Sequence, residues 1–171
     1  MQSKAPSVLI SACLLGDAVR YDGRSKGVDH PAITMWINTH CLVKICPEVS
    51  GGLPVPRLPA EIISGGDPES VRSGRIVLHS AAGQHVSEPF LRGAQAALKL
   101  AKAHGVCLAV LKEGSPSCGS GYVYNGQFDG GQVSGQGIST TVLRDAGIPV
   151  FSEHALDEAL VHWQRIASHT L

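Results

Sequence analysis

The chain has 171 residues, of which 43% are hydrophobic, and this is enough to build the core of one domain. Its 14 basic and 14 acidic side chains balance, so the sequence lacks the excess positive charge that is typical of proteins that bind duplex nucleic acid or an anionic membrane. No apolar run approaches the roughly 20 residues that span a bilayer, and the N-terminal residues lack a signal-peptide pattern. We therefore expect a single cytoplasmic α/β domain over residues 1–171, without a membrane or a nucleic acid duplex as partner.

The cysteine count narrows the chemistry. Five cysteines, an odd number in a chain without secretory features, argue against a disulfide framework. The C-x-x-C pairs of common zinc and iron–sulfur sites are absent as well. The spacing of the cysteines alone is therefore weak evidence, and their position relative to the predicted strands is more informative.

Three predicted strands, at residues 8–12, 42–45 and 106–111, each lead to a cysteine. Cys13 and Cys46 follow the first two strands directly, and Cys118 lies in the loop after the third. In an open parallel sheet the carboxyl ends of the strands lie along one edge, where ligands bind. The sequence therefore predicts that three remote thiols form a single site.

The other elements, in chain order, indicate a Rossmann-like three-layer fold with a small, mainly parallel sheet. A helix follows Pro31, and the glycine- and proline-rich residues 49–62 predict an irregular loop that forms a wall of the site. A short hairpin arm is expected near residues 75–78, a helix with Ser87 as its N-cap, and an ordered flap over residues 119–137. Ser139 is expected to cap a short helix, residues 148–151 to form an edge strand, and Ser152 to start a final helix.

A free cysteine often acts as a small buried hydrophobe, and we expect this of Cys41 and Cys107. Cys13, Cys46 and Cys118 lie beside free backbone N–H groups, which should lower the pKa of each thiol and stabilise a negatively charged cluster. Three thiolates leave one position open on zinc, or one iron of a cubane cluster without a protein ligand. Such a metal is a Lewis acid that can accept a substrate atom, and iron prefers sulfur.

Polar side chains beside these thiols are candidates for the chemistry. Glu48, two residues after Cys46, could act as general acid and base. Ser115 and Ser117 could donate hydrogen bonds to the substrate or to cluster sulfur.

Three motifs carry a resemblance to a known family, and further likeness follows at Gly135-x-Gly137-Ile138-Ser139 and Gly147-Ile148-Pro149-Val150. Between residues 8 and 151 the chain resembles the thiouracil desulfidase (TudS-like) family, long catalogued as a domain of unknown function. The motifs are Ser11-Ala12-Cys13-Leu14-Leu15-Gly16 with Val19-Arg20-Tyr21-Asp22-Gly23, Cys46-Pro47-Glu48 with Gly51-Gly52-Leu53 and Pro56-Arg57-x-Pro59-x-Glu61-Ile62, and Glu113-Gly114-Ser115-Pro116-Ser117-Cys118-Gly119. Asn125 stands where the family pattern suggests Asp, and Ile138-Ser139 where Val-Thr is common, which bears on substrate detail rather than on the thiols.

The resemblance implies a [4Fe-4S] cluster held by Cys13, Cys46 and Cys118, whose open iron takes the sulfur of a thiolated pyrimidine. The implied reaction is a non-redox hydrolysis that gives a uracil-type product and hydrogen sulfide. Glu48 would activate water and return a proton, and Ser115 or Ser117 would orient the substrate.

Arg20 and Arg57 are candidates for binding a nucleotide phosphate, and Ser11 is a further candidate for substrate contact. The sequence leaves open whether the substrate is a free base, nucleoside or nucleotide, which thio position reacts, and the oligomeric state.

Two other functions fit the residues before the resemblance is considered. One is a metal-free cysteine-based sulfur carrier or transferase, with Cys118 or Cys13 as nucleophile. The other is a non-catalytic module with structural zinc, closed by a fourth ligand from His30, His40 or His85. The metal content of anaerobically purified protein separates all three.

Overall fold

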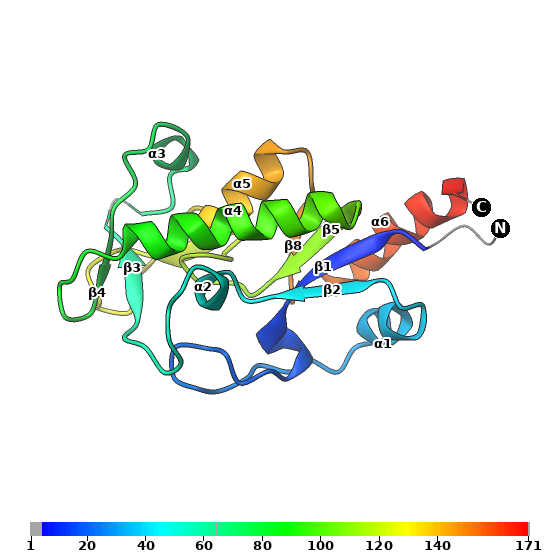
Figure 1. The fold of residues 1–171 in the computed structure, drawn as a ribbon, viewed down its shortest axis with the longest axis horizontal. Coiled ribbons are helices and arrows are strands. Elements are labelled where there is room, and N and C mark those ends of the chain that lie inside the picture. The colour runs from blue at the N-terminus through cyan, green and yellow to red at the C-terminus, as the bar shows by residue number, and fades with distance from the viewer. Residues whose placement is uncertain (1–4, 64, 171) are drawn as a thin grey trace.

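The computed structural model describes residues 5–63 and 65–170, and a parallel sheet runs through its centre (Figure 1). The strand order is β2-β1-β5-β8, and all three pairings are parallel. The α/β fold with a small parallel sheet is thus confirmed. The four strands are β1 (Ser7–Ser11), β2 (Leu42–Ile45), β5 (Val106–Leu111) and β8 (Val150–Ser152).

Helices cover both faces of this sheet, because successive residues of a strand point to opposite sides. Val8 and Ile10 of β1 pack with α1 (Pro31–Asn38) and α6 (Leu156–Thr170), whereas Leu9 packs against α4 (Ser87–Ala103) and α5 (Ile138–Asp145). Both sides of the sheet therefore belong to the core. None of the helices in the described part of the chain is long and apolar enough to cross a membrane.

The strand order reverses between β1 and β5. From β1 the chain passes through α1 to β2 on one side, and it returns through α4 to β5 on the other side. In sheets of this kind ligands bind outside the carboxyl ends of the strands, at the point of reversal. The crevice between the ends of β1 and β5 is therefore the favoured place for a site.

Two small antiparallel sheets stand beyond this edge. They pair β3 (Ala60–Ile62) with β4 (Leu78–Ser80), and β6 (Tyr122–Tyr124) with β7 (Gln132–Ser134). The strand predicted at residues 75–78 is shifted to β4, its partner β3 comes earlier in the chain, and the predicted flap is a hairpin. The segment predicted to be an irregular loop contains β3 and part of α2 (Pro47–Ser50); η1 (Ala12–Leu15) and α3 (Pro68–Arg72) are further short helices.

Three helices were predicted to start at a serine, and each prediction was wrong by one or more residues. The Oγ of Ser87 accepts a hydrogen bond from the N–H of Leu78 at 2.9 Å, and α4 begins at Ser87 itself. Ser139 lies inside the first turn of α5, whose N–H groups bond instead to carbonyls of the Cys118 loop. Ser152 ends β8, four residues before α6 begins. At α5 tertiary hydrogen bonds replace the predicted local cap, and at α4 the hydroxyl of Ser87 is used in a tertiary hydrogen bond instead of capping the helix.

Candidate active site

Three thiols reach one cavity from the carboxyl ends of three strands. Cys13 lies in η1 after β1, Cys46 is the N-cap of α2 after β2, and Cys118 lies in the loop after β5. All three line a cavity of about 410 Å³. Cys41 and Cys107 do not line it and instead belong to the apolar cluster beneath α1 and α6.

Close packing of α2 on α4 fixes the loop that carries Cys46. Gly51 and Gly93 face backbone across this contact: a Cβ at Gly51 would collide with the carbonyl of Pro89, and one at Gly93 with the carbonyl of Pro47. A side chain at either glycine would push the two helices apart. The sequence therefore needs glycine at both positions to hold Cys46 at the cavity.

The start of α5 fixes the loop that carries Cys118. Thr140 donates its hydroxyl to the carbonyl of Cys118 at 2.9 Å, and the N–H of Ser139 donates to the carbonyl of Ser117 at 2.9 Å. Gly137 lies so close that a Cβ would stand 2.6 Å from the backbone nitrogen of Cys118. The loop is thus held through its backbone, and none of these three contacts uses the thiol.

Burial dominates the acidity of the free thiols. Burial, and next the neighbouring Cys46, raises the pKa of Cys13 to about 11, although the positive charges of Arg20 and Lys112 oppose this. Burial raises the pKa of Cys46 despite N–H groups at the start of α2, and it raises that of Cys118 well above its usual range. The predicted lowering of the thiol pKa values was therefore wrong for the metal-free chain. Metal binding must release these protons.

The donor set fits an iron–sulfur cluster. Three thiols share one cavity, yet among the residues that the structure describes no three His, Cys, Asp or Glu side chains are placed to hold a single metal ion. A cubane cluster spans a larger space than one ion and takes cysteine thiolates as ligands. None of His30, His40 and His85 lines the cavity, so the structural-zinc alternative has no fourth ligand from that set.

Glu48 lies in the same wall, in the first turn of α2. Its Oε2 accepts a hydrogen bond from Nε of Arg57 at 2.7 Å, and Nη2 of Arg57 lies 2.6 Å from the same oxygen. Its Oε1 lies 3.3 Å from the hydroxyl of Ser115, which donates to it. The charge of Glu48 also acts on Cys46 and Cys118, and it opposes ionisation of both thiols. A fixed carboxylate therefore stands beside two of the three thiols.

The remaining predicted site residues differ in their access to the cavity. Ser115 and Arg20 line it, and Arg20 also lies over the ring of Tyr21. Ser117 does not line it, and its buried hydroxyl has no hydrogen-bond partner among the residues that the structure describes. Ser11 lines it, but its hydroxyl donates to the sulfur of Cys118 at 3.7 Å and is buried.

Comparison with known proteins identifies the family. The model of the 2-thiouracil desulfurase family matches residues 8–155, which is most of the chain. The chain belongs to this family. The predicted resemblance is confirmed, and with it the prediction of a desulfidase enzyme. Over 153 residues the chain is 40% identical to YbbK of Bacillus subtilis (strain 168), covering 90% of this chain and 99% of that protein. A solved structure of a [4Fe-4S]-dependent thiouracil desulfidase, TudS, aligns with a TM-score of 0.80 at 45% identity, covering 90% of this chain and 94% of that one.

Sequence reasoning missed several residues of this desulfurase that line the cavity. Lys112 directly precedes the motif that contains Cys118 and Glu113 begins it, but no spacing rule set them apart. Glu61, in the middle of β3, accepts hydrogen bonds from the N–H groups of Gly126 and Phe128 at 3.0 and 3.2 Å and so ties the β6–β7 hairpin to the β3–β4 arm. Four aromatic residues that line the cavity were also missed. Tyr21 comes from the loop after β1, and Tyr122, Tyr124 and Phe128 come from the β6–β7 hairpin.

Proposed function

We propose that this chain is a [4Fe-4S]-dependent thiouracil desulfidase that hydrolyses the C–S bond of a thiolated pyrimidine, releasing hydrogen sulfide. The observation that carries the proposal is the presence of Cys13, Cys46 and Cys118 in one cavity wall, which in the described residues holds no further cysteine and no histidine. Family membership and the cofactor of the TudS relative support it.

Cys13, Cys46 and Cys118 would hold the cluster, and each would bind it as a thiolate. Such a cluster would supply a Lewis-acidic iron without a protein ligand, which could polarise the thiocarbonyl sulfur of the substrate.

Glu48 supplies the proton transfers. Arg57 occupies one carboxylate oxygen, so Oε1 is the oxygen that can take a proton from the water attacking the ring carbon. The electron pair of the C–S bond passes to sulfur, the water oxygen becomes the carbonyl oxygen, and both water protons end on sulfur as hydrogen sulfide. No electrons enter or leave, and general acid–base catalysis of this kind contributes roughly 10²–10⁴-fold to the rate.

The substrate ring would lie among the aromatic side chains of the cavity. Base–aromatic stacking contributes about 1–3 kcal/mol per base.

Ser115, which faces the cavity beside Glu48, is a better candidate than Ser117 to orient the ring. Arg20 is the better candidate for a substrate phosphate, because Arg57 already bonds to Glu48 and to two backbone carbonyls. Ser11 would act by holding Cys118 rather than by touching the substrate.

Anaerobic reconstitution tests the proposal. We expect about four irons and four sulfides per wild-type chain, and sulfide release from 2- or 4-thiouracil or their monophosphates. Cys13→Ala, Cys46→Ala and Cys118→Ala should each abolish cluster retention, whereas Cys107→Ala, matched in chemistry but outside the cavity, should keep it. Glu48→Gln should retain the cluster and turn over at least 100-fold more slowly.

A colourless, metal-free chain with full activity would contradict the proposal and favour a cysteine-based sulfur carrier. The raised pKa of Cys118, caused first by burial, argues against that alternative, since the thiolate is the nucleophile.

A further inference from the structure

Lys112 is a charged residue of the cavity wall that the reaction above does not use. It is the first residue after β5, and its N–H donates to Oγ of Ser11 at 3.0 Å. The same Ser11 hydroxyl donates to the sulfur of Cys118. Lys112 therefore lies at the point where the strand order reverses, between the strands that lead to Cys13 and Cys118.

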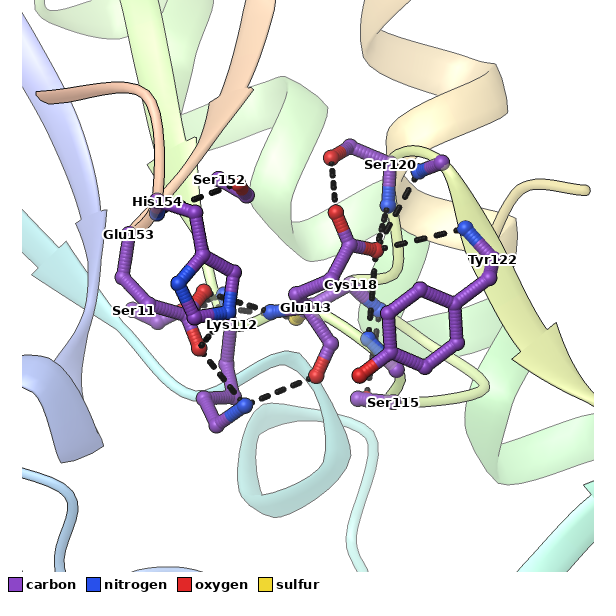
Figure 2. Close-up of polar contacts among 12 residues, drawn as sticks. Ser11, Lys112, Glu113, Ser115, Cys118, Ser120, Tyr122, Ser152, Glu153 and His154 are labelled. Atoms are coloured by element: carbon purple, nitrogen blue, oxygen red, sulfur yellow. Dashed lines mark hydrogen bonds and ion pairs between the residues drawn. The ribbon is translucent and has the colours of Figure 1, made fainter. Parts of the chain in front are cut away.

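The fourth strand of the sheet supplies the partner of Lys112. Glu153, directly after β8, places Oε1 at 2.6 Å from Nζ of Lys112, and Nζ also donates to the carbonyl of Glu113 at 2.8 Å (Figure 2). The other oxygen of Glu153 accepts the N–H of Glu113 at 2.7 Å. His154 also approaches Oε1, at 3.8 Å, but its side chain is 71% exposed. Glu153 thus fixes both the side chain of Lys112 and the backbone beside it.

Stabilisation of the fold does not by itself explain why Lys112 and Glu153 form a buried ion pair. The side chains of Lys112 and Glu153 are only 20% and 9% exposed, and a buried ion pair is often no more stabilising than apolar residues of the same size. An ammonium group has three N–H donors. Two of them meet Glu153 and the Glu113 carbonyl, which leaves one for the cavity that Lys112 lines.

Arg57, Glu48 and Glu61 are committed to protein partners, whereas Arg20, the other cation of the cavity wall, lies 3.9 Å from Asp22 and is the candidate for a substrate phosphate. Arg57 and Glu48 form a close pair. The carboxylate of Glu61 accepts two N–H groups of the β6–β7 hairpin. Lys112 therefore combines a fixed position, a free donor and a place beside the thiols.

We propose that Lys112, held by Glu153, is a fixed cation that offsets the negative charge of the three-thiol site and stabilises the charge that builds on sulfur as the C–S bond breaks. The proposal rests on the proposed function, in which that bond's electron pair passes to sulfur before both water protons have reached it. A fixed ammonium is effective there because its interactions strengthen as the sulfur becomes anionic. Lys112 acts through its charge, and Glu153 is the residue that positions it.

Variants of the reconstituted holoenzyme test the proposal through the midpoint potential of the cluster and through kcat and KM. In Lys112→Met the potential should shift to more negative values, because the reduced cluster carries one more negative charge and has lost a nearby cation. Its kcat should fall at least tenfold with KM changed less than threefold. Lys112→Arg, which keeps the charge, should restore the potential and most of kcat. Lys99→Met, on the exposed side of α4, removes the same charge and should change neither value.

Glu153→Gln supplies a second readout with the opposite sign. It removes a negative charge, so the potential should become less negative, yet kcat should still fall because Lys112 is no longer held. Wild-type potential and kcat in Lys112→Met, or equal losses in Lys112→Met and Lys112→Arg, would overturn the proposal. If the wild-type protein retains no cluster, the proposed function fails, and the role of Lys112 fails with it. If the wild-type protein holds the cluster but Lys112→Met leaves its midpoint potential unchanged, only the role of Lys112 is refuted.

Discussion

Arg57 directs Nε and Nη2 to the same carboxylate oxygen of Glu48, at 2.7 and 2.6 Å, in a pair whose side chains are only 7% and 13% exposed. Nη2 of Arg57 also donates to the carbonyl of Val19, and that carbonyl lies 3.9 Å from the sulfur of Cys46. The arginine expected to bind a substrate phosphate is thus bonded within the protein. It fixes the proposed acid–base residue relative to a proposed cluster ligand.

Replacing Arg57 should therefore impair catalysis more than binding. In Arg57→Met, Glu48 keeps its charge without a partner, and breaking a buried pair in this way costs about 3–5 kcal/mol of stability. We expect kcat to fall at least tenfold while KM changes less, measured by sulfide release from reconstituted protein. Arg75→Met, at an exposed position, is the matched control. A large rise in KM for a thiolated monophosphate, with kcat unchanged, would instead restore the phosphate-binding role.

Phe128 should contribute to substrate affinity and little to stability. Its side chain lines the cavity, is 38% exposed, and sits on a backbone with φ of +55°, a strained value for a non-glycine residue that its N–H bond to Glu61 helps to hold. We expect Phe128→Ala to raise KM about fivefold to 150-fold, corresponding to about 1–3 kcal/mol of lost stacking. Steady-state kinetics and thermal unfolding provide the test, with Val133→Ala, equally exposed on β7, as control. An unchanged KM would place the ring elsewhere in the cavity.

Glu113 should make the stability of the Cys118 loop depend on acid pH. Burial alone would raise the pKa of Glu113, but hydrogen bonds from the Ser120 hydroxyl and from N–H groups of Gly121, Ser120 and Gly114 outweigh it, so the pKa lies below its usual value. A carboxylate with a lowered folded-state pKa contributes stability above its unfolded pKa, and this is lost as pH falls through the folded value.

The matching measurement is the unfolding free energy of wild type and Glu113→Gln across pH. Wild type should be more stable at neutral pH, and the difference should begin to shrink below about pH 4.5, near the ordinary pKa of a glutamate. Glu158→Gln, exposed on α6, is the control. A difference that stays constant down to pH 2 would show that hydrogen bonding without charge accounts for the effect.

Gly93→Ala should loosen the contact that positions Cys46. Alanine favours a helix interior by about 1 kcal/mol over glycine, but its Cβ would collide with the backbone of Pro47, and overpacking typically costs about 1–3 kcal/mol. Because the obstacle is backbone, we expect the collision to dominate, giving a net loss of about 1 kcal/mol or more and lower iron content after reconstitution. Gly27→Ala, where the added Cβ meets only an ordinary 3.5 Å contact, is the control. Full iron content in Gly93→Ala would show that this contact does not govern the site.

The main sheet and its helices were predictable because the signals for them are local. Residues 106–111 form an apolar run between glycines, and α4 shows apolar residues at helical spacing up to Gly105. The short strands β3, β6 and β7 could not be predicted in this way. Each has only three residues, too few to show a clear alternating pattern; β3 pairs with β4, more than 15 residues along the chain, and β6 and β7 pair with each other.

Prediction of the site had a similar limit. The strand-then-cysteine pattern indicated which thiols meet, because strand ends of a parallel sheet share an edge. The partners of the charged residues depend on tertiary contacts. Arg57 could not be distinguished from a free phosphate-binding arginine, and Glu153 is more than 30 residues from the cysteine motifs in sequence although it contacts Lys112.

The hold of α5 on the Cys118 loop bears on how this protein acquires and replaces its cofactor. Those hydrogen bonds join protein atoms only, so one anchor of the site is in place before any iron arrives. A chain emptied by oxidation should then remain folded and accept a fresh cluster from a donor, without the folding step that couples metal uptake to structure in zinc fingers. After damage by oxygen, the cluster would thus be replaced while the protein stays folded.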